Sequence, residues 1–345
     1  MPPKSLGDTY KKLLIPLCFA LTMLVMFFFD PLSFQETWKG RAFYLFFLWL
    51  FALEFILGGK SLKKGTNHGS DTARIILGVF ALTIPAIYAV EFYLFGLSNT
   101  VTQLAEFLGA GQGLSPSAQA WELTLSFPIS LEYFVVAISL FVGVLLLLDF
   151  DGIKQFSISL SFLVLIGIFY MIDTFYPYST ASVPNLLSPT LPQSGFSIQS
   201  FVPFISSIVA FVMQRLGYVV HMVVLQDGSV EMLVNGFGFL IYWPCAGVYS
   251  LFIYTFVILL FLKNSPMSLL AKIGCFVVGA VGTFFVNILR IVSILNIYVT
   301  SGASEGEIFH NYYGELFFLG WIVVYLFALT LVQRFLTRGE PVEVS

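Results

Sequence analysis

Long apolar segments follow one another along almost the whole chain, and they constrain the fold more than any other feature of the sequence. A segment of roughly 18 or more apolar residues can cross the hydrocarbon core of a bilayer as a helix. Only 10% of the residues are charged, against about 25% in an ordinary soluble domain. The sequence therefore predicts an all-α polytopic membrane protein. About eight transmembrane helices are expected, at residues 13–29, 41–59, 75–96, 125–148, 155–175, 247–263, 272–298 and 313–333.

Basic residues indicate the orientation of these helices. Lysine and arginine lie before the first segment, after the second, around the loop that follows the sixth and after the last. The loops at residues 97–124, 176–200 and 299–312 contain neither. Because basic loops stay in the cytoplasm, we expect both termini to be cytoplasmic and these three loops to face outward from the cell membrane.

Residues 201–244 break the alternation of helix and loop. Residues 201–222 are apolar, but a crossing there would invert the charge pattern of every later helix. Asp227-Gly228 and Asn235-Gly236 then separate short β-branched and aromatic runs, which is the pattern of tight hairpin turns. We therefore expect an extracytoplasmic interfacial or re-entrant helix that carries Arg215, followed by a small β-meander that ends at Pro244.

Several functional classes have no support in the sequence. No basic stripe with interleaved aromatic residues suggests nucleic acid as a partner. The three cysteines show no paired spacing, and the chain lacks H-E-x-x-H and G-x-S-x-G motifs. We accordingly predict no metal and no cofactor.

Cys245 stands directly after Pro244, at the predicted start of the sixth transmembrane helix. Proline suits the first position of a helix, so Cys245 is expected in the opening turn, where the positive end of the helix dipole favours a thiolate. The alternative is a buried structural cysteine, and this is our interpretation of Cys18 and Cys275, which lie among apolar residues. Position alone leaves both interpretations of Cys245 open.

Arg290 lies within the outer half of the seventh predicted helix. A charge inside the membrane costs about 2.5 kcal/mol or more, which points to a function or a partner. Thr283, Asn287 and Arg290 share one helix face by their spacing, and glycines at 274, 279 and 282 allow close helix packing. An arginine that reaches the outer headgroups is the structural alternative.

His310 lies at the outer entrance of the last predicted helix. His68 falls in a polar cytoplasmic loop and His221 near the meander, where solvated or interfacial positions are expected. Only His310 shares a membrane depth with Cys245, and it can supply the base that a nucleophilic thiol needs. Alone, it would be interpreted as a polar anchor at the interface.

Three short segments contain these residues: Pro244-Cys245-Ala246-Gly247, Asn287-Ile288-Leu289-Arg290-Ile291 and His310-Asn311-Tyr312-Tyr313-Gly314. In order and spacing they resemble the signature blocks of the exosortase/archaeosortase family of membrane cysteine transpeptidases. The resemblance covers roughly residues 200 to 335. The chain departs from the family pattern at Ala246, where serine is usual, and at Asn311, where an acidic residue often follows the histidine.

The resemblance implies a thiol protease and transpeptidase that sorts exported proteins. Such enzymes cut a C-terminal tail made of a short proline-containing motif, a transmembrane helix and a basic cluster, and pass the new C-terminus to a lipid or other surface acceptor. We expect Cys245 to form a thioester, His310 to transfer protons and Arg290 to stabilise the oxyanion, the thiolate or the substrate. Supporting or substrate-binding roles are expected for three further residues: Asn287, Arg215 and Asn311. Of these, Asn287 would orient Arg290.

A multi-pass transporter or channel-like protein is the main rival interpretation. It would use the glutamates that interrupt the predicted helices, namely Glu54, Glu91 and Glu132. Such proteins are expected to contain inverted repeats, which the two halves of this chain do not show. Glu91 and Glu132 lie near the outer ends of their predicted helices, and we expect them instead to reach water or to pair with Arg215 or Arg290.

The predicted organisation is a single multi-pass membrane domain at residues 1–345. Within it, residues 1–200 hold five helices with outer loops, residues 201–335 form the catalytic region, and residues 336–345 form a cytoplasmic tail.

Overall fold

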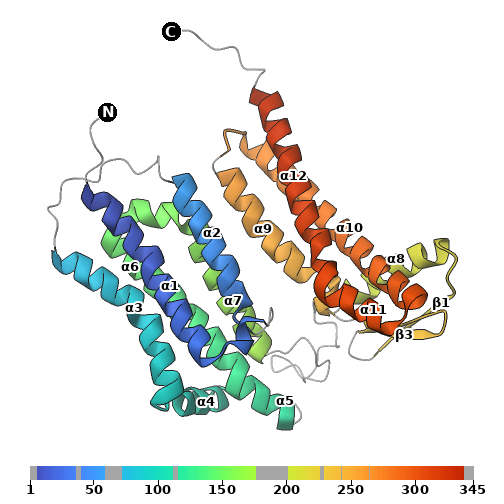
Figure 1. Ribbon diagram of the computed structural model, residues 1–345, viewed down its shortest axis with the longest axis horizontal. Coiled ribbons are helices and arrows are strands. Elements are labelled where there is room, and N and C mark those ends of the chain that lie inside the picture. The colour runs from blue at the N-terminus through green and yellow to red at the C-terminus, as the bar shows by residue number, and fades with distance from the viewer. Residues whose placement is uncertain are drawn as a thin grey trace, which may run out of the picture. The chain divides into compact units, whose positions relative to one another are not determined.

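The computed structural model describes residues 6–35, 40–58, 72–111, 116–175, 201–225, 229–241, 243–263 and 265–337. The chain is mostly helical and divides into two compact units, Met1–Pro177 and Tyr178–Ser345 (Figure 1). Each unit is described below by itself. The single membrane domain stays a prediction.

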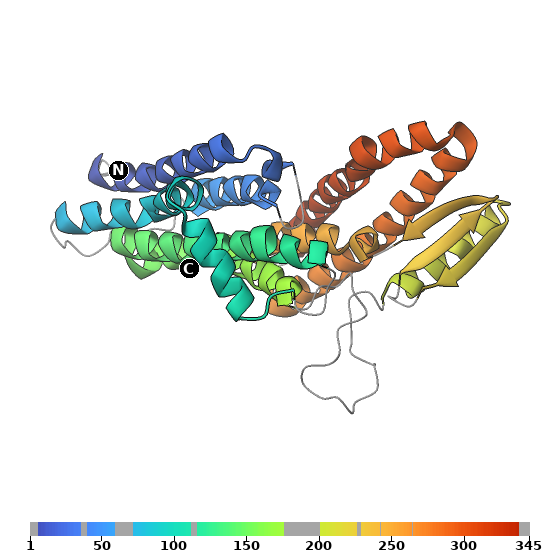
Figure 2. The same cartoon turned by 90° about the horizontal axis from the view of Figure 1, so that it is seen from below.

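The first unit is a helical bundle built around α6. The helices α1, α3, α6 and α7 pack lengthwise, and α6 contacts both α3 and α7 (Figure 2). The bounds are α1 Leu6–Phe29, α2 Ala42–Gly58, α3 Thr72–Leu94, α4 Leu97–Phe107, α5 Pro116–Trp121, α6 Phe127–Gln155 and α7 Ser157–Phe175. Asp149 has a φ of 57°, so the regular part of α6 ends at residue 148, as the sequence predicted.

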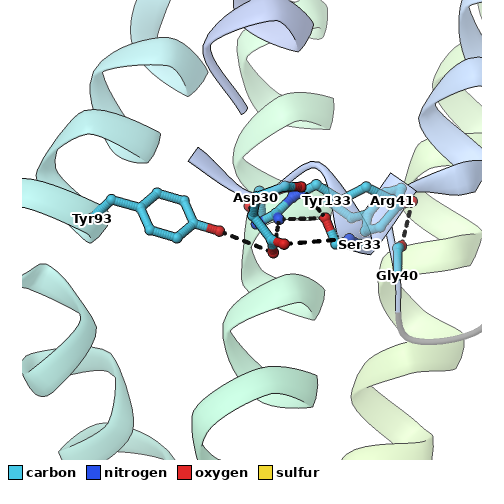
Figure 3. A network of polar contacts seen from close by, with 7 residues as sticks. Asp30, Ser33, Gly40, Arg41, Tyr93 and Tyr133 are labelled. Carbon is cyan, nitrogen blue, oxygen red and sulfur yellow. Dashed lines mark hydrogen bonds and ion pairs between the residues drawn. The ribbon is translucent and has the colours of Figure 1, made fainter. Parts of the chain in front are cut away.

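A buried ionic network joins the ends of four helices in this unit (Figure 3). Arg41, just before α2, donates to both carboxylate oxygens of Glu132 on α6, at 2.7 and 2.5 Å. Its Nη1 also donates to Asp30 after α1 and to Ser33, both at 2.8 Å. Tyr93 on α3 donates to Asp30 at 3.3 Å. Glu132 therefore pairs with Arg41, and our expectation that it reaches water or pairs with Arg215 or Arg290 is wrong.

Glu54 also has a structural role. This buried carboxylate on α2 accepts hydrogen bonds from the backbone N–H groups of Ile158 and Ser159, at 3.2 and 2.9 Å, and from the Ser159 hydroxyl at 2.7 Å. It thus caps the amino end of α7, where the helix dipole favours a negative charge. Because Glu54 and Glu132 both have structural partners, the transporter interpretation loses two of its three carboxylates.

The second unit combines several packed helices with a small sheet. Its elements are α8 Phe201–Arg215, β1 Val220–Val224, β2 Val230–Val234, β3 Phe237–Ile241, α9 Val248–Lys263, α10 Leu269–Ser301, α11 Ala303–Ile308 and α12 Gly314–Thr337. The helices α9 and α12 both pack against α10, while α8 packs against β1, β2 and α10.

The predicted β-meander is confirmed. The three strands pair antiparallel in the order β1-β2-β3, with Val220 opposite Val234 and Val234 opposite Phe237. Asn235 and Gly236 both have positive φ, 48° and 88°, as a two-residue hairpin turn of this kind requires. The other predicted turn, Asp227-Gly228, lies outside the described residues.

Four described helices are long and apolar enough to cross a membrane: Thr72–Leu94, Gln119–Gln155, Leu269–Ser301 and Leu316–Gln333. Each coincides with a predicted transmembrane helix. Five shorter apolar helices occupy Leu14–Phe29, Ala42–Ile56, Ser157–Ile172, Phe201–Arg215 and Val248–Lys263. Four of these coincide with the remaining predicted spans, and the fifth is the helix expected at the interface. The total of eight crossings stays a prediction.

Candidate active site

The candidate nucleophile lies in a short turn between the sheet and α9. Trp243–Ala246 form one turn of 3₁₀ helix, Gly247 follows with a φ of 81°, and α9 begins at Val248. Cys245 is half-buried in this turn. The prediction that Cys245 opens the sixth transmembrane helix is therefore wrong. The left-handed conformation of Gly247 interrupts the helical path, so the cysteine precedes α9 instead of belonging to it.

Asn287 on α10 holds the cysteine turn in place. Its Nδ2 donates a hydrogen bond of 3.0 Å to the backbone carbonyl of Cys245. The side chain is only 4% exposed. The turn also packs tightly on it, because a Cβ added at Gly247 would lie 2.6 Å from Asn287 Cγ. The structure thus gives Asn287 a contact with the cysteine turn, whereas the orientation of Arg290 by Asn287 stays a prediction.

Arg290 lies one helical turn beyond Asn287, on the same face of α10. The side chain is half-buried and its Nε is fully buried. A Cβ added at Gly314 would lie 2.9 Å from this Nε, so the guanidinium packs against the backbone where α12 begins. Glycine at 314 therefore provides the room that the arginine occupies.

Three helices line a narrow crevice beside Arg290, which is too tight to admit a water molecule. Its walls come from α9, α10 and α12, and its lining residues are Ser250, Thr283, Val286, Asn287, Arg290, Phe317 and Phe318. Trp321 on α12 donates to the Thr283 hydroxyl at 3.0 Å, which fixes one end. The predicted close packing at Gly279 and Gly282 is confirmed, because a Cβ at either position would overlap an aromatic side chain. Gly274 has open space beside it.

His310 lies in one turn of π-helix, Phe309–Tyr313, which joins α11 to α12. It is half-buried and stands four residues before Gly314, the glycine that contacts Arg290. Single turns of π-helix are frequent at functional sites. The structure thus places His310 on the segment that packs beside Arg290. The convergence of thiol, guanidinium and imidazole stays a prediction.

The other predicted site residues have different surroundings. Arg215 ends α8 in an exposed position, with its guanidinium 5.1 Å from the centre of the Phe211 ring. The side chain of Asn311 lies outside the described part of the structure. His221 is exposed on β1, in keeping with the interfacial position predicted for it.

Sequence reasoning missed two contributions to the site. Ser250 lines the crevice from α9 and is 7% exposed. A small polar residue one turn after Gly247, in a helix that is mostly apolar, is the signal that could have identified Ser250. Phe317 and Phe318 close the crevice from α12, but nothing distinguishes them in a chain with 39 phenylalanines.

A second pocket, of about 430 Å³, lies between the end of α10 and the π-helical turn. It is lined by Ile297, Ser301, Glu305, Ile308, Phe309 and Tyr313. Among the described residues, no group of three histidine, cysteine, aspartate or glutamate side chains is arranged to hold a metal ion.

The fold and the site define a multi-pass membrane protein in which a cysteine turn is held on an arginine-bearing helix. The family model of the transmembrane exosortases matches residues 114–327, well over half of the chain. The chain therefore belongs to the transmembrane exosortase family. No curated protein and no solved structure matches the chain.

Proposed function

We propose that this exosortase family protein is a membrane-embedded cysteine transpeptidase that cleaves the C-terminal sorting signal of exported proteins. The Cys245 thiolate attacks the scissile carbonyl, the C–N bond breaks, and the amine leaves with a proton from His310. The resulting thioester is attacked by a lipid or other surface acceptor, which gives its proton to His310 as the C–S bond breaks. Arg290 stabilises the oxyanion of both tetrahedral intermediates.

The observation that carries this proposal is the hydrogen bond between Asn287 and the carbonyl of Cys245. It fixes the cysteine turn on the helix face that also bears Arg290, about 4.5 Å further along the axis. A nucleophile and a cation held by one rigid helix are pre-organised with respect to each other, and such pre-organisation is the main source of electrostatic catalysis. The family match supports the same class of chemistry.

Partial burial suits the role proposed for Arg290. A cation aimed at a developing oxyanion is worth more in a poorly hydrated site than in water. The Oδ1 of Asn287 is also buried, and no described residue supplies it with a hydrogen bond. We propose that it accepts one from a substrate amide beside the scissile bond.

We further propose that the site faces the extracytoplasmic side, with both termini in the cytoplasm. The basic loops support this orientation. A substrate anchored by its own transmembrane helix would then approach through the lipid and leave its motif at the outer interface. The partners are exported proteins that end in a motif, a helix and a basic tail.

The acyl-enzyme can be tested directly. The reporter is an exported protein that carries the tail of a candidate substrate encoded in the same genome, identified by a motif, one helix and a basic cluster. Hydroxylamine attacks thioesters, so we expect it to divert the cleaved reporter to a C-terminal hydroxamate, visible by mass spectrometry. Cleavage that yields no hydroxamate at any hydroxylamine concentration would count against a thioester.

Arg290→Gln should lower kcat for reporter cleavage by roughly 10²–10³-fold, the effect of removing one oxyanion donor. Arg215→Gln is the comparison, because Arg215 is exposed at the end of α8, and the substrate-binding role expected for it would change KM but leave kcat unchanged within about threefold. The two variants are compared by initial rates in detergent or nanodiscs. Equal losses in both would argue that basic charge near the substrate, and not a specific donor, is what matters.

A further inference from the structure

The strand β3 forms one open edge of the small sheet. Asn235 donates its backbone N–H to the Val219 carbonyl, so the backbone N–H and C=O groups of Asn235 point towards β1. The backbone groups of the neighbouring residue, Val234, therefore point the other way, towards β3, where Val234 pairs with Phe237. By this alternation the backbone groups of Phe237 and of every second residue after it bond to β2. Those of Gly238 and Leu240 point away from the sheet.

These outward groups are accessible. No described residue supplies a hydrogen bond to the backbone N–H or C=O of Gly238 or Leu240. Gly238 is exposed and the Leu240 side chain is 56% exposed. The strand reads Phe-Gly-Phe-Leu-Ile, without the proline or charge that natural proteins use to protect an edge. An edge of this kind is a template for pairing with another extended chain.

The edge leads directly to the candidate nucleophile. β3 ends at Ile241, and the cysteine turn begins two residues later. Five residues of chain span at most about 18 Å, which is the greatest separation of the Cα atoms of Leu240 and Cys245. A peptide paired with Leu240 therefore reaches the thiol within about five further residues. The opposite edge, on β1, lies two strand spacings away, about 10 Å, and connects to α8.

We propose that the open edge of β3 binds an extended segment of the peptide substrate as a fourth strand and thereby presents the scissile bond to Cys245. This inference rests on the proposed function. Backbone hydrogen bonds at Gly238 and Leu240 fix the substrate chain in an extended conformation, while alternate side chains give specificity. Unpaired backbone groups are costly inside hydrocarbon, so the edge lies at the interface, where a segment beside a membrane anchor arrives.

The first test compares proline on the two edges. Leu240→Pro removes an outward N–H and leaves the bonds between β2 and β3 intact, since proline is tolerated at such positions. Met222→Pro is the matched control, because Met222 occupies the outward-pointing register of β1. We expect Leu240→Pro to lower reporter cleavage about tenfold or more and Met222→Pro to change it less than about twofold. Cleavage by Leu240→Pro at more than half the normal rate, or equal losses in both variants, would overturn the proposal.

The second test measures docking without chemistry. A photo-reactive phenylalanine analogue is placed at position 240 or 222 of the Cys245→Ala chain, and the tailed reporter is co-expressed. A cross-link to the reporter from position 240 but not from 222 is the expected result. Cross-links from both positions, or a product of twice the chain's mass from pairing of two copies, would contradict it. Cleavage retained by Cys245→Ala would refute the proposed function alone, because the cross-link does not depend on cleavage.

Discussion

Replacing Cys245 by alanine should abolish cleavage of the tailed reporter, with a fall in kcat of roughly 10⁴-fold or more. The thiol supplies the electron pair that forms the acyl-enzyme, and alanine cannot replace it. Asn287 bonds to the backbone carbonyl of residue 245 and not to its side chain, so the turn itself should survive the substitution. The measurement is the ratio of cleaved to intact reporter on immunoblots, at matched levels of enzyme in the membrane.

Two other cysteines provide internal controls. Cys18 is 7% exposed on α1, and Cys275 is half-buried on α10, towards the opposite end of that helix from Arg290. Cys18→Ala and Cys275→Ala should each keep at least about half of the cleavage, because Cys18 belongs to the other unit and Cys275 lies about 18 Å before Asn287 along the axis of α10. A membrane-impermeant thiol reagent on intact cells should also label Cys245 and spare it once the site is made inaccessible by bound substrate. Full cleavage by Cys245→Ala would show that the nucleophile lies elsewhere.

The sequence predicts the helices well because length and apolarity alone determine whether a segment can span a bilayer. It misses α4, which falls in a region predicted as an outer loop. That helix is short and mixes polar with apolar residues, and only a narrow stripe that includes Val101 and Ala105 is buried. Its stability comes from packing against neighbouring helices. Its apolar residues do recur at helical spacing, but the helix has only 11 residues and is too short to cross a bilayer, so a search for transmembrane segments passes over it.

Prediction from the sequence is limited in a similar way at the candidate site. Spacing places Thr283, Asn287 and Arg290 on one face, and the crevice that they line agrees with this. Spacing also suggests that Asn287 serves its helical neighbour Arg290. The structure adds a contact that spacing does not suggest: Asn287 Nδ2 donates to the backbone carbonyl of Cys245, 42 positions away in sequence, beside Gly247. Such a contact depends on how α9 packs on α10, which periodicity within one helix does not encode.

Arg41 should be the residue whose loss most destabilises the first unit. It is 2% exposed, and its removal leaves the carboxylate of Glu132, itself 3% exposed, without its bidentate partner. Breaking a buried ion pair in this way costs about 3–5 kcal/mol. We expect Arg41→Met to lower the thermal unfolding midpoint in detergent by about 10 °C. Arg74→Met, which breaks the exposed pair with Asp149, should cost about 1 kcal/mol or less.

The size of the loss in stability should depend on which charge remains. Glu132→Gln leaves Arg41 with its second partner, Asp30, so this substitution should destabilise less than Arg41→Met. Removing both charges of the buried pair, as Arg41→Met with Glu132→Leu, should recover much of the lost stability, because buried pairs are often replaced by apolar residues at little cost. The wild-type protein, Arg41→Met, Glu132→Leu and the double variant form a double-mutant cycle. If the double variant lost the sum of the single losses, Arg41 and Glu132 would be acting independently, and the network would owe its stability to hydrogen bonds with the surrounding tyrosines instead.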